Sequence, residues 1–107
     1  MRKRQLNVGE RVWDCDNHQW VNILSFGNGE TTLEDKDGET MVVVDNHDFD
    51  ETYTIRAAAL YKVAGKFVLN RDGEEHIICY EHFESIDYPY YCPDYDENFY
   101  TSELDAK

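Results

Sequence analysis

The sequence predicts a small, mainly β domain, built as a barrel or a curled antiparallel sheet of about five to seven strands, with an acidic, tyrosine-rich C-terminal extension. Three observations support this class. Short apolar segments rich in β-branched and aromatic residues recur through residues 8–84. Glycine-containing turns, two of them Asp-Gly, separate these segments. A chain of 107 residues is long enough for one modest core.

The first half is expected to form a four-stranded meander that follows a basic arm at residues 1–7. VGERVWDC (8–15) and WVNILSF (20–26) are typical of strands, since both are rich in branched and aromatic residues. TTLEDKDGETMVVV (31–44) predicts a hairpin with Asp37-Gly38 at its tip. DNHDFDE (45–51) is expected to be a polar, acidic loop.

The second half is expected to hold one more hairpin. Residues 54–69 predict a short helical turn or extended link and then a strand at 66–69. The Asp72-Gly73 turn joins this strand to HIICYEHF (76–83), which gives a hairpin over 66–82. Beyond Glu84, Pro89 and Pro93 argue against a regular helix or a central strand. The expected organisation is therefore an arm (1–7), a β domain (8–84) and an extension (85–107) packed on or beside it.

Two short segments repeat the same three residues, each after an apolar strand. Asp16-Asn17-His18 and Asp45-Asn46-His47 are both followed two residues later by an aromatic side chain. Turns stabilised by Asn or Asp side chains favour this composition, so the repeat is expected to reflect similar turns and not a duplication.

The opening V-G-E-R-V-W-D, a short break and W-V-N-I-L resemble the start of small SH3-like barrels. The pattern is similar to that of uncharacterised proteins from bacteriophages and gut bacteria which begin G-D-x-V-x-D … G-W-G-x-V. The resemblance covers residues 8–44, and Asn17-His18-Gln19 replaces the usual glycines at the second turn. It implies an SH3-like barrel that binds proteins, peptides or nucleic acids, and it carries over no catalytic residue.

Negative charge is concentrated near the C-terminus. Residues 1–71 contain twelve acids and nine bases, whereas residues 72–107 contain eleven acids and only Lys107 as a base. A surface of this sign repels nucleic acid and attracts basic proteins. We therefore expect a basic protein partner, one that itself binds nucleic acid, and no direct contact with nucleic acid or membrane. The N-terminus lacks the apolar run of a signal peptide, which predicts a location in the cytoplasm of a bacterial host.

No motif predicts an enzyme, and no cofactor is expected. The serines lie outside any nucleophile-elbow pattern, and the glycines mark hairpins and do not form a phosphate-binding loop. The metal prediction is likewise none. The alternative is a small structural zinc domain, because two C-x-x-H steps could complete a tetrahedral shell: Cys15, His18, Cys79 and His82.

The segment between Tyr80 and Tyr100 contains eight aromatic residues interleaved with acids. Tyrosine is enriched in protein interfaces, and spaced carboxylates can take the place of phosphates. This composition predicts a non-enzymatic protein that binds and inhibits a nucleic-acid-handling host protein, in the manner of a DNA mimic or anti-defence factor. The resemblance of residues 8–44 implies that such a protein comes from a phage or mobile element. The partner-binding residues would be Asp87, Tyr88, Tyr90, Tyr91, Asp94, Tyr95, Asp96, Glu97 and Tyr100.

Two other interpretations of the aromatic residues stay open. The tyrosines could instead fold back and seal one end of a barrel, since a small domain needs every apolar residue that it can bury. A different binding mode would place a peptide or a methylated side chain against Trp13, Trp20 and neighbouring aromatics, as an SH3-like adaptor or reader.

Overall fold

The computed structural model describes residues 5–34, 38–80, 90–99 and 104–106. Within these residues it contains eleven strands and two short 3-10 helices, which confirms the mainly β, antiparallel class. The strands are β1 (Leu6–Asn7), β2 (Arg11–Asp14), β3 (Gln19–Phe26), β4 (Thr32–Leu33), β5 (Met41–Asn46), β6 (Glu51–Arg56), β7 (Leu60–Leu69), β8 (Glu75–Tyr80), β9 (Tyr90–Cys92), β10 (Glu97–Phe99) and β11 (Leu104–Ala106). The helices are η1 (His47–Phe49) and η2 (Ala57–Ala59). No helix in the described part of the chain is long and apolar enough to cross a membrane.

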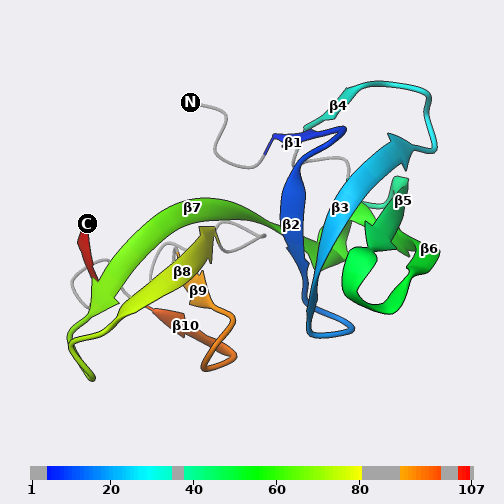
Figure 1. Cartoon of the computed structure of the whole chain (residues 1–107). Helices are drawn as coiled ribbons and strands as arrows, with labels where there is room; N and C mark the ends of the chain where they lie inside the picture. The colour runs from blue at the N-terminus through cyan, green and yellow to red at the C-terminus, as the bar shows by residue number, and fades with distance from the viewer. Residues whose placement is uncertain (1–4, 35–37, 81–89, 100–103, 107) are drawn as a thin grey trace.

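One long, curved strand joins two halves of a continuous sheet (Figure 1). The strand order is β10-β9-β8-β7-β2-β3-β5-β6, and β11 pairs with β7. The first three residues of β7 pair with β2, and its later residues pair with β8. The register shifts between Val63 and Gly65, where β7 changes neighbours. Gly65 has a φ of +149°, a conformation that other residues rarely adopt, so a glycine suits this bulge.

The four-stranded meander is present, but its fourth strand is not the expected one. Strands β2, β3, β5 and β6 form it. Strand β6 begins at the end of the segment expected to be a polar loop (45–51) and continues into the segment expected to start with a helical turn or extended link (54–69). The predicted hairpin at 31–44 is wrong, because β4 pairs with β1 while β5 pairs with β3 and β6. The physical reason is burial: Leu33 on β4 and Leu6 on β1 both enter the main core.

The predicted second hairpin is confirmed, and it continues into the C-terminal segment. β7 and β8 are joined through the turn at Asp72-Gly73, but β7 starts six residues earlier than the expected strand at 66–69. Contrary to the expectation from Pro89 and Pro93, β9 is an internal strand that pairs with both β8 and β10. Pro93 lies in the turn after β9, where its missing N–H breaks no ladder hydrogen bond. Residues 90–99 are therefore part of the sheet.

The buried side chains form three clusters that follow this division of the sheet. The largest lies among β1–β6, η2 and Leu60 at the start of β7. The second half has a cluster on each face of the sheet, because neighbouring residues of a strand point in opposite directions. Ile78, Cys92 and Phe99 belong to one cluster, whereas Cys79 and Tyr91 belong to the other, together with Trp13. Tyr91 is thus packed in the core. This agrees with the alternative interpretation, in which tyrosines of the C-terminal segment fold back onto the domain.

A buried carboxylate fixes the turn between β2 and β3. Asp14 is fully buried, and its Oδ1 accepts hydrogen bonds from the backbone N–H groups of Asp16 (2.9 Å) and Asn17 (3.0 Å). Its Oδ2 accepts from the Asn17 side chain at 2.8 Å and from the Tyr53 hydroxyl. The Tyr53 oxygen in turn accepts from the side chain of Gln19 at 2.9 Å. Strand β6 is in this way connected to the start of the meander.

Tyr53→Phe should reduce stability by about 1–2 kcal/mol at neutral pH, because Asp14 loses one of its donors. Burial and the hydrogen bond to Asp14 raise the pKa of Tyr53 from 10.0 to about 12, and Glu51 adds to the rise. A raised pKa means that the native state holds the Tyr53 proton more tightly than the unfolded state does. The contribution of this hydroxyl to stability is therefore complete below pH 10, and it is lost as the pH rises through about 12. Urea unfolding of both proteins across this range should show the difference between them shrinking. A difference that stays constant with pH would contradict the assignment.

Candidate functional site

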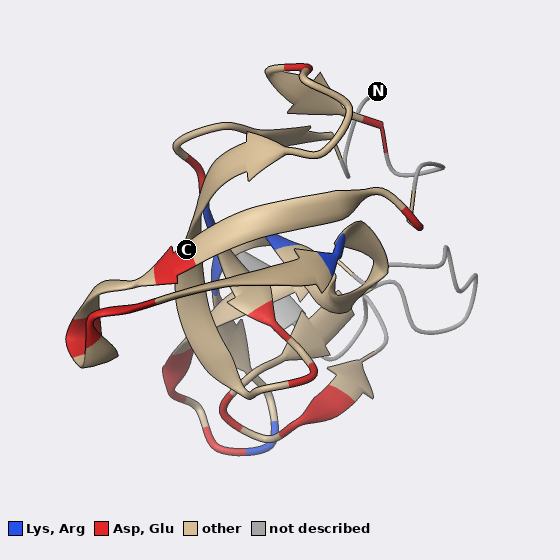
Figure 2. Ribbon diagram, turned by 90° about the vertical axis from the view of Figure 1, so that its right-hand side faces the viewer, with Lys and Arg blue, Asp and Glu red and all other residues tan. Residues whose placement is uncertain are grey.

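Two neighbouring turns at one end of the sheet carry the exposed acids of the second half whose burial the structure describes. Residues 70–75 and 93–97 contain six carboxylates and one arginine, a formal balance of −6 + 1 = −5. We name this set of carboxylates the acidic end: Asp72, Glu74, Glu75, Asp94, Asp96 and Glu97. All but Asp72 are exposed. In Figure 2, acidic positions are concentrated in turns and at strand ends, with few basic positions near them.

The single arginine of this region is held inside it. Arg71 Nη1 lies 2.7 Å from Glu97 Oε2, and the guanidinium group stands 4.9 Å from the ring centre of Tyr95 and 4.8 Å from that of Phe99. These contacts tie the β7–β8 turn to β10. Arg71 neutralises one carboxylate and leaves the acidic end strongly negative.

His76 bridges the two turns through both of its ring nitrogens. Nδ1 lies 2.7 Å from Asp94 Oδ2, and Nε2 lies 2.8 Å from Asp72 Oδ2. The hydrogen bonds to Asp94 and Asp72 raise the pKa of His76, against a smaller opposite effect of burial. The Tyr95 hydroxyl also donates to Asp72, and this bond, with the Glu74 backbone N–H, lowers the pKa of Asp72 to about 2. The turns are therefore fixed relative to each other by a hydrogen-bonded network.

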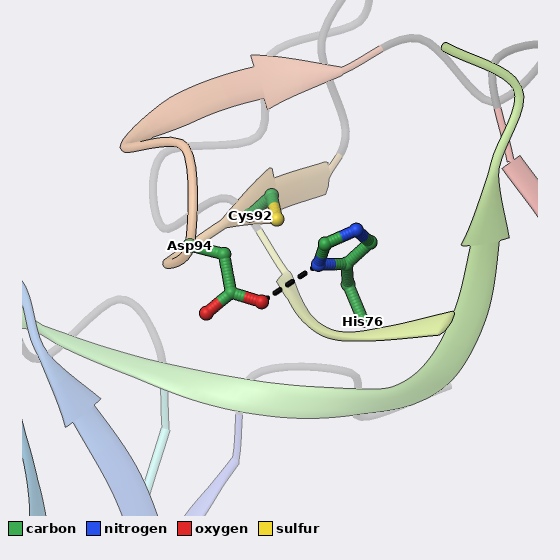
Figure 3. Close-up of side chains that lie close together, drawn as sticks. All are labelled: His76, Cys92 and Asp94. Atoms are coloured by element: carbon green, nitrogen blue, oxygen red, sulfur yellow. Dashed lines mark hydrogen bonds and ion pairs between the residues drawn. The ribbon is translucent and has the colours of Figure 1, made fainter. Parts of the chain in front are cut away.

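A buried thiol lies beside this histidine. Figure 3 shows Cys92, His76 and Asp94 converging from β9, β8 and the β9–β10 turn. The Cys92 sulfur, one nitrogen of His76 and one carboxylate oxygen of Asp94 all lie within 4.8 Å of one another. Among the described residues, this is the one group of three or more His, Cys, Asp or Glu side chains close enough to share a metal ion.

The structure divides the residues expected to bind a partner. Asp94, Tyr95, Asp96 and Glu97 are exposed and lie together at the β9–β10 turn. Tyr90 is half-buried against Phe67, and Tyr91 is only 4% exposed, with its hydroxyl donating to Asp96. Tyr91 is thus a core residue and not an exposed anchor. Asp87, Tyr88 and Tyr100 lie outside the described residues.

The zinc ligands suggested by the C-x-x-H steps do not form a cluster in the described part of the chain. Cys15 and Cys79 pack in the same apolar cluster, but His18 is exposed and lies against the edge of Trp13. His82 lies outside the described residues. The pairing of His76 with Cys92 was missed because no local spacing relates them. The β8–β9 register brings their strands together, and the Cys92–Asp94 step was the only short-range signal.

The tryptophans do not form an exposed aromatic cage. Trp13 is 8% exposed and belongs to the core. Trp20 lines an apolar groove of about 320 Å³ together with Arg11, Val63, Gly65, Lys66 and Ile77. The Arg11 guanidinium stands 5.6 Å from the Trp20 ring centre. Arg11 and Lys66 in this groove would repel a methylated lysine, which is itself a cation, whereas the alternative of peptide binding stays open.

No protein-family model, curated protein or solved structure matches this chain.

Proposed function

We propose that the protein is a non-enzymatic binding protein whose acidic end docks on a basic surface of a nucleic-acid-handling protein and blocks it. The observation that carries the proposal is the gathering of six carboxylates, against one arginine, on two turns that contact each other. A field of this sign and density accelerates encounter with lysine- and arginine-rich surfaces.

The geometry of the acidic end favours specific docking over mere solubility. Asp94, Asp96 and Glu97 are exposed, and each is positioned by a contact with His76, Tyr91 or Arg71. Tyr95 is 37% exposed between them and presents part of an aromatic ring at the centre of the negative surface. Groups that are already ordered lose less conformational entropy on binding, and a tyrosine supplies contact area that a purely acidic tail lacks.

The class of partner follows from the same chemistry. A surface that binds phosphate groups is rich in lysine and arginine and often carries aromatic stacking residues. Carboxylates beside a tyrosine ring complement such a surface, which is the basis of the DNA-mimic, anti-defence role that we propose. The phage or mobile-element origin rests on the resemblance of residues 8–44 alone.

Affinity for the partner should fall steeply with ionic strength. We expect a loss of roughly tenfold or more between about 0.05 M and about 0.5 M salt, because exposed charges are screened over that range. The full chain would serve as bait in a bacterial lysate, and binding of the captured protein would then be titrated at several salt concentrations with and without duplex DNA. Displacement by DNA and weakening by salt support mimicry. Capture that resists both would rule it out.

A further inference from the structure

Three side chains from different parts of the fold offer nitrogen, sulfur and oxygen to a common point. His76 comes from β8, Cys92 from β9 and Asp94 from the following turn, and their ligand atoms lie within 4.8 Å of one another (Figure 3). Zinc accepts this mixture, with distances of about 2.0–2.1 Å to nitrogen, 2.3 Å to sulfur and 2.0–2.2 Å to oxygen. Harder ions such as magnesium and calcium prefer oxygen alone.

The surroundings of His76 match those of a metal-binding histidine. Such a histidine usually donates its second ring N–H to a carboxylate, which fixes the ring and its tautomer. Asp72 Oδ2 lies 2.8 Å from Nε2, and Asp72 is itself held by the Tyr95 hydroxyl and by the Glu74 backbone N–H at 2.8 Å. With Nε2 occupied in this way, Nδ1 is directed at Asp94.

The surroundings of Cys92 suit a coordinated sulfur. The Cys92 backbone carbonyl accepts from the N–H groups of Tyr95 (3.2 Å) and Asp96 (2.8 Å), which closes the Cys-Pro-Asp-Tyr turn around the residue. Cys92 is fully buried, so solvent does not compete for its sulfur.

We propose that His76 Nδ1, Cys92 Sγ and Asp94 bind a zinc-type divalent cation, with Asp72 as the carboxylate that orients His76. The metal takes the place of the proton shared between Nδ1 and Asp94 Oδ2, which are 2.7 Å apart. Tetrahedral coordination needs about 3.3 Å between these two atoms. Asp94 can make this movement, since its side chain is 64% exposed on a turn. Three protein ligands leave the fourth position to water.

The test uses the full-length chain, reduced and treated with chelator, and titrates it with Co²⁺ and then Zn²⁺. We expect one equivalent of Co²⁺ to bind with a thiolate-to-metal charge-transfer band, which Zn²⁺ abolishes. Cys92→Ser should lose the band, whereas the control Cys15→Ser should keep it. A band that survives in Cys92→Ser and disappears in Cys15→Ser would place the metal on the C-x-x-H steps and overturn the proposal, as would the absence of any band in the original chain.

A second set of variants separates metal binding from loss of structure. Asp94→Asn changes an exposed side chain, and it should weaken Co²⁺ binding while leaving the circular dichroism spectrum unchanged. His76→Ala should abolish binding, and the control His47→Ala, at a histidine that pairs only with Asp45 among the described residues, should not. Asp72→Asn should weaken binding by about 10–100-fold. Unchanged affinity in both Asp94→Asn and Asp72→Asn would contradict the site. None of these measurements needs the protein partner, so they are independent of the proposed function.

Discussion

Replacing Asp94, Asp96 and Glu97 together by Asn, Asn and Gln should abolish capture of the basic partner. The change removes three of the six carboxylates of the acidic end, and the local balance falls from −5 to −2. Charge pairs that are desolvated at an interface each contribute on the order of 2 kcal/mol or more, so we expect at least a hundredfold loss of affinity. The measurement is a binding titration at low salt, with the partner identified by the original chain.

The amide variants are chosen to leave the hairpin intact. Asp96 has a φ of +54°, a conformation that Asn tolerates nearly as well as Asp. The ion pair between Arg71 and Glu97 is largely exposed and contributes little to stability. Thermal melting of the triple variant should therefore stay close to that of the original chain, and a lost fold would be recognised there.

A matched control lies at the opposite edge of the sheet. The turn between β5 and β6 carries Asp48 and Asp50 beside Glu51, all exposed, around Phe49, which is 73% exposed. The triple variant Asp48→Asn, Asp50→Asn, Glu51→Gln removes the same charge and should leave partner binding within about threefold. Equal losses in the two triple variants would show that only net charge matters. Loss in Trp20→Ala, with binding retained in the acidic-end variant, would transfer the function to the Trp20 groove.

The sequence predicted those strands whose neighbours along the chain are also their neighbours in the sheet. The turn at Asp72-Gly73 and the strands on either side of it were predicted because they form one local hairpin. The pairing of β1 with β4 was not predictable, since only the burial of Leu6 and Leu33 in a common core selects it. The length of β7 was underestimated because its first part pairs with β2, far away in the sequence.

The remaining error concerns a hairpin turn that lacks glycine, at 93–96. The turns at 15–18, 47–50 and 93–96 each end in a residue with positive φ, namely His18 (+53°), Asp50 (+49°) and Asp96 (+54°). Asn, Asp and His are the residues that most readily replace glycine in this conformation. PDYD at 93–96 is thus the same kind of turn as CDNH at 15–18. Its proline and acids are typical of a turn between two strands, whereas we expected an irregular extension there.

The repeated Asp-Asn-His segments do mark similar turns, but in a shifted alignment. The side chain of Asp14 accepts the backbone N–H of Asp16, and the side chain of Asn46 accepts that of Asp48. Asp14 and Asn46 are the two buried polar side chains in the described part of the chain, and each stands four residues before a residue with positive φ. In the repeated Asp-Asn-His pattern Asp16 corresponds to Asp45, whereas in the structure Asp14 and Asn46 have corresponding roles in their turns. Composition identified the turns, and only burial shows which residue stabilises each one.

Asp14→Ala should be among the most destabilising substitutions in the described part of the chain, at about 3 kcal/mol. Asp14 is fully buried and accepts from two backbone N–H groups, the Asn17 side chain and the Tyr53 hydroxyl. Hydrogen bonds to a charged group contribute about 1.5–3 kcal/mol each. Asp16 and Asn17 are exposed, so water can replace the carboxylate as the acceptor for their donors and offset part of the loss. The lasting loss is then at Tyr53, which is half-buried, and in the cavity left behind.

Asp14→Asn separates the two halves of this carboxylate. An amide oxygen at the Oδ1 position still accepts from Asp16 and Asn17, but an NH₂ group at the Oδ2 position faces the donors of Asn17 and Tyr53. We therefore expect about half of the alanine effect, measured as the change in free energy of unfolding by urea denaturation. In a Tyr53→Phe background the step from Asp to Asn should become smaller, since the Tyr53 donor is already absent. Additive losses in the double variant, or a change below about 1 kcal/mol for Asp14→Ala, would show that the connection between β2 and β6 does not stabilise the meander.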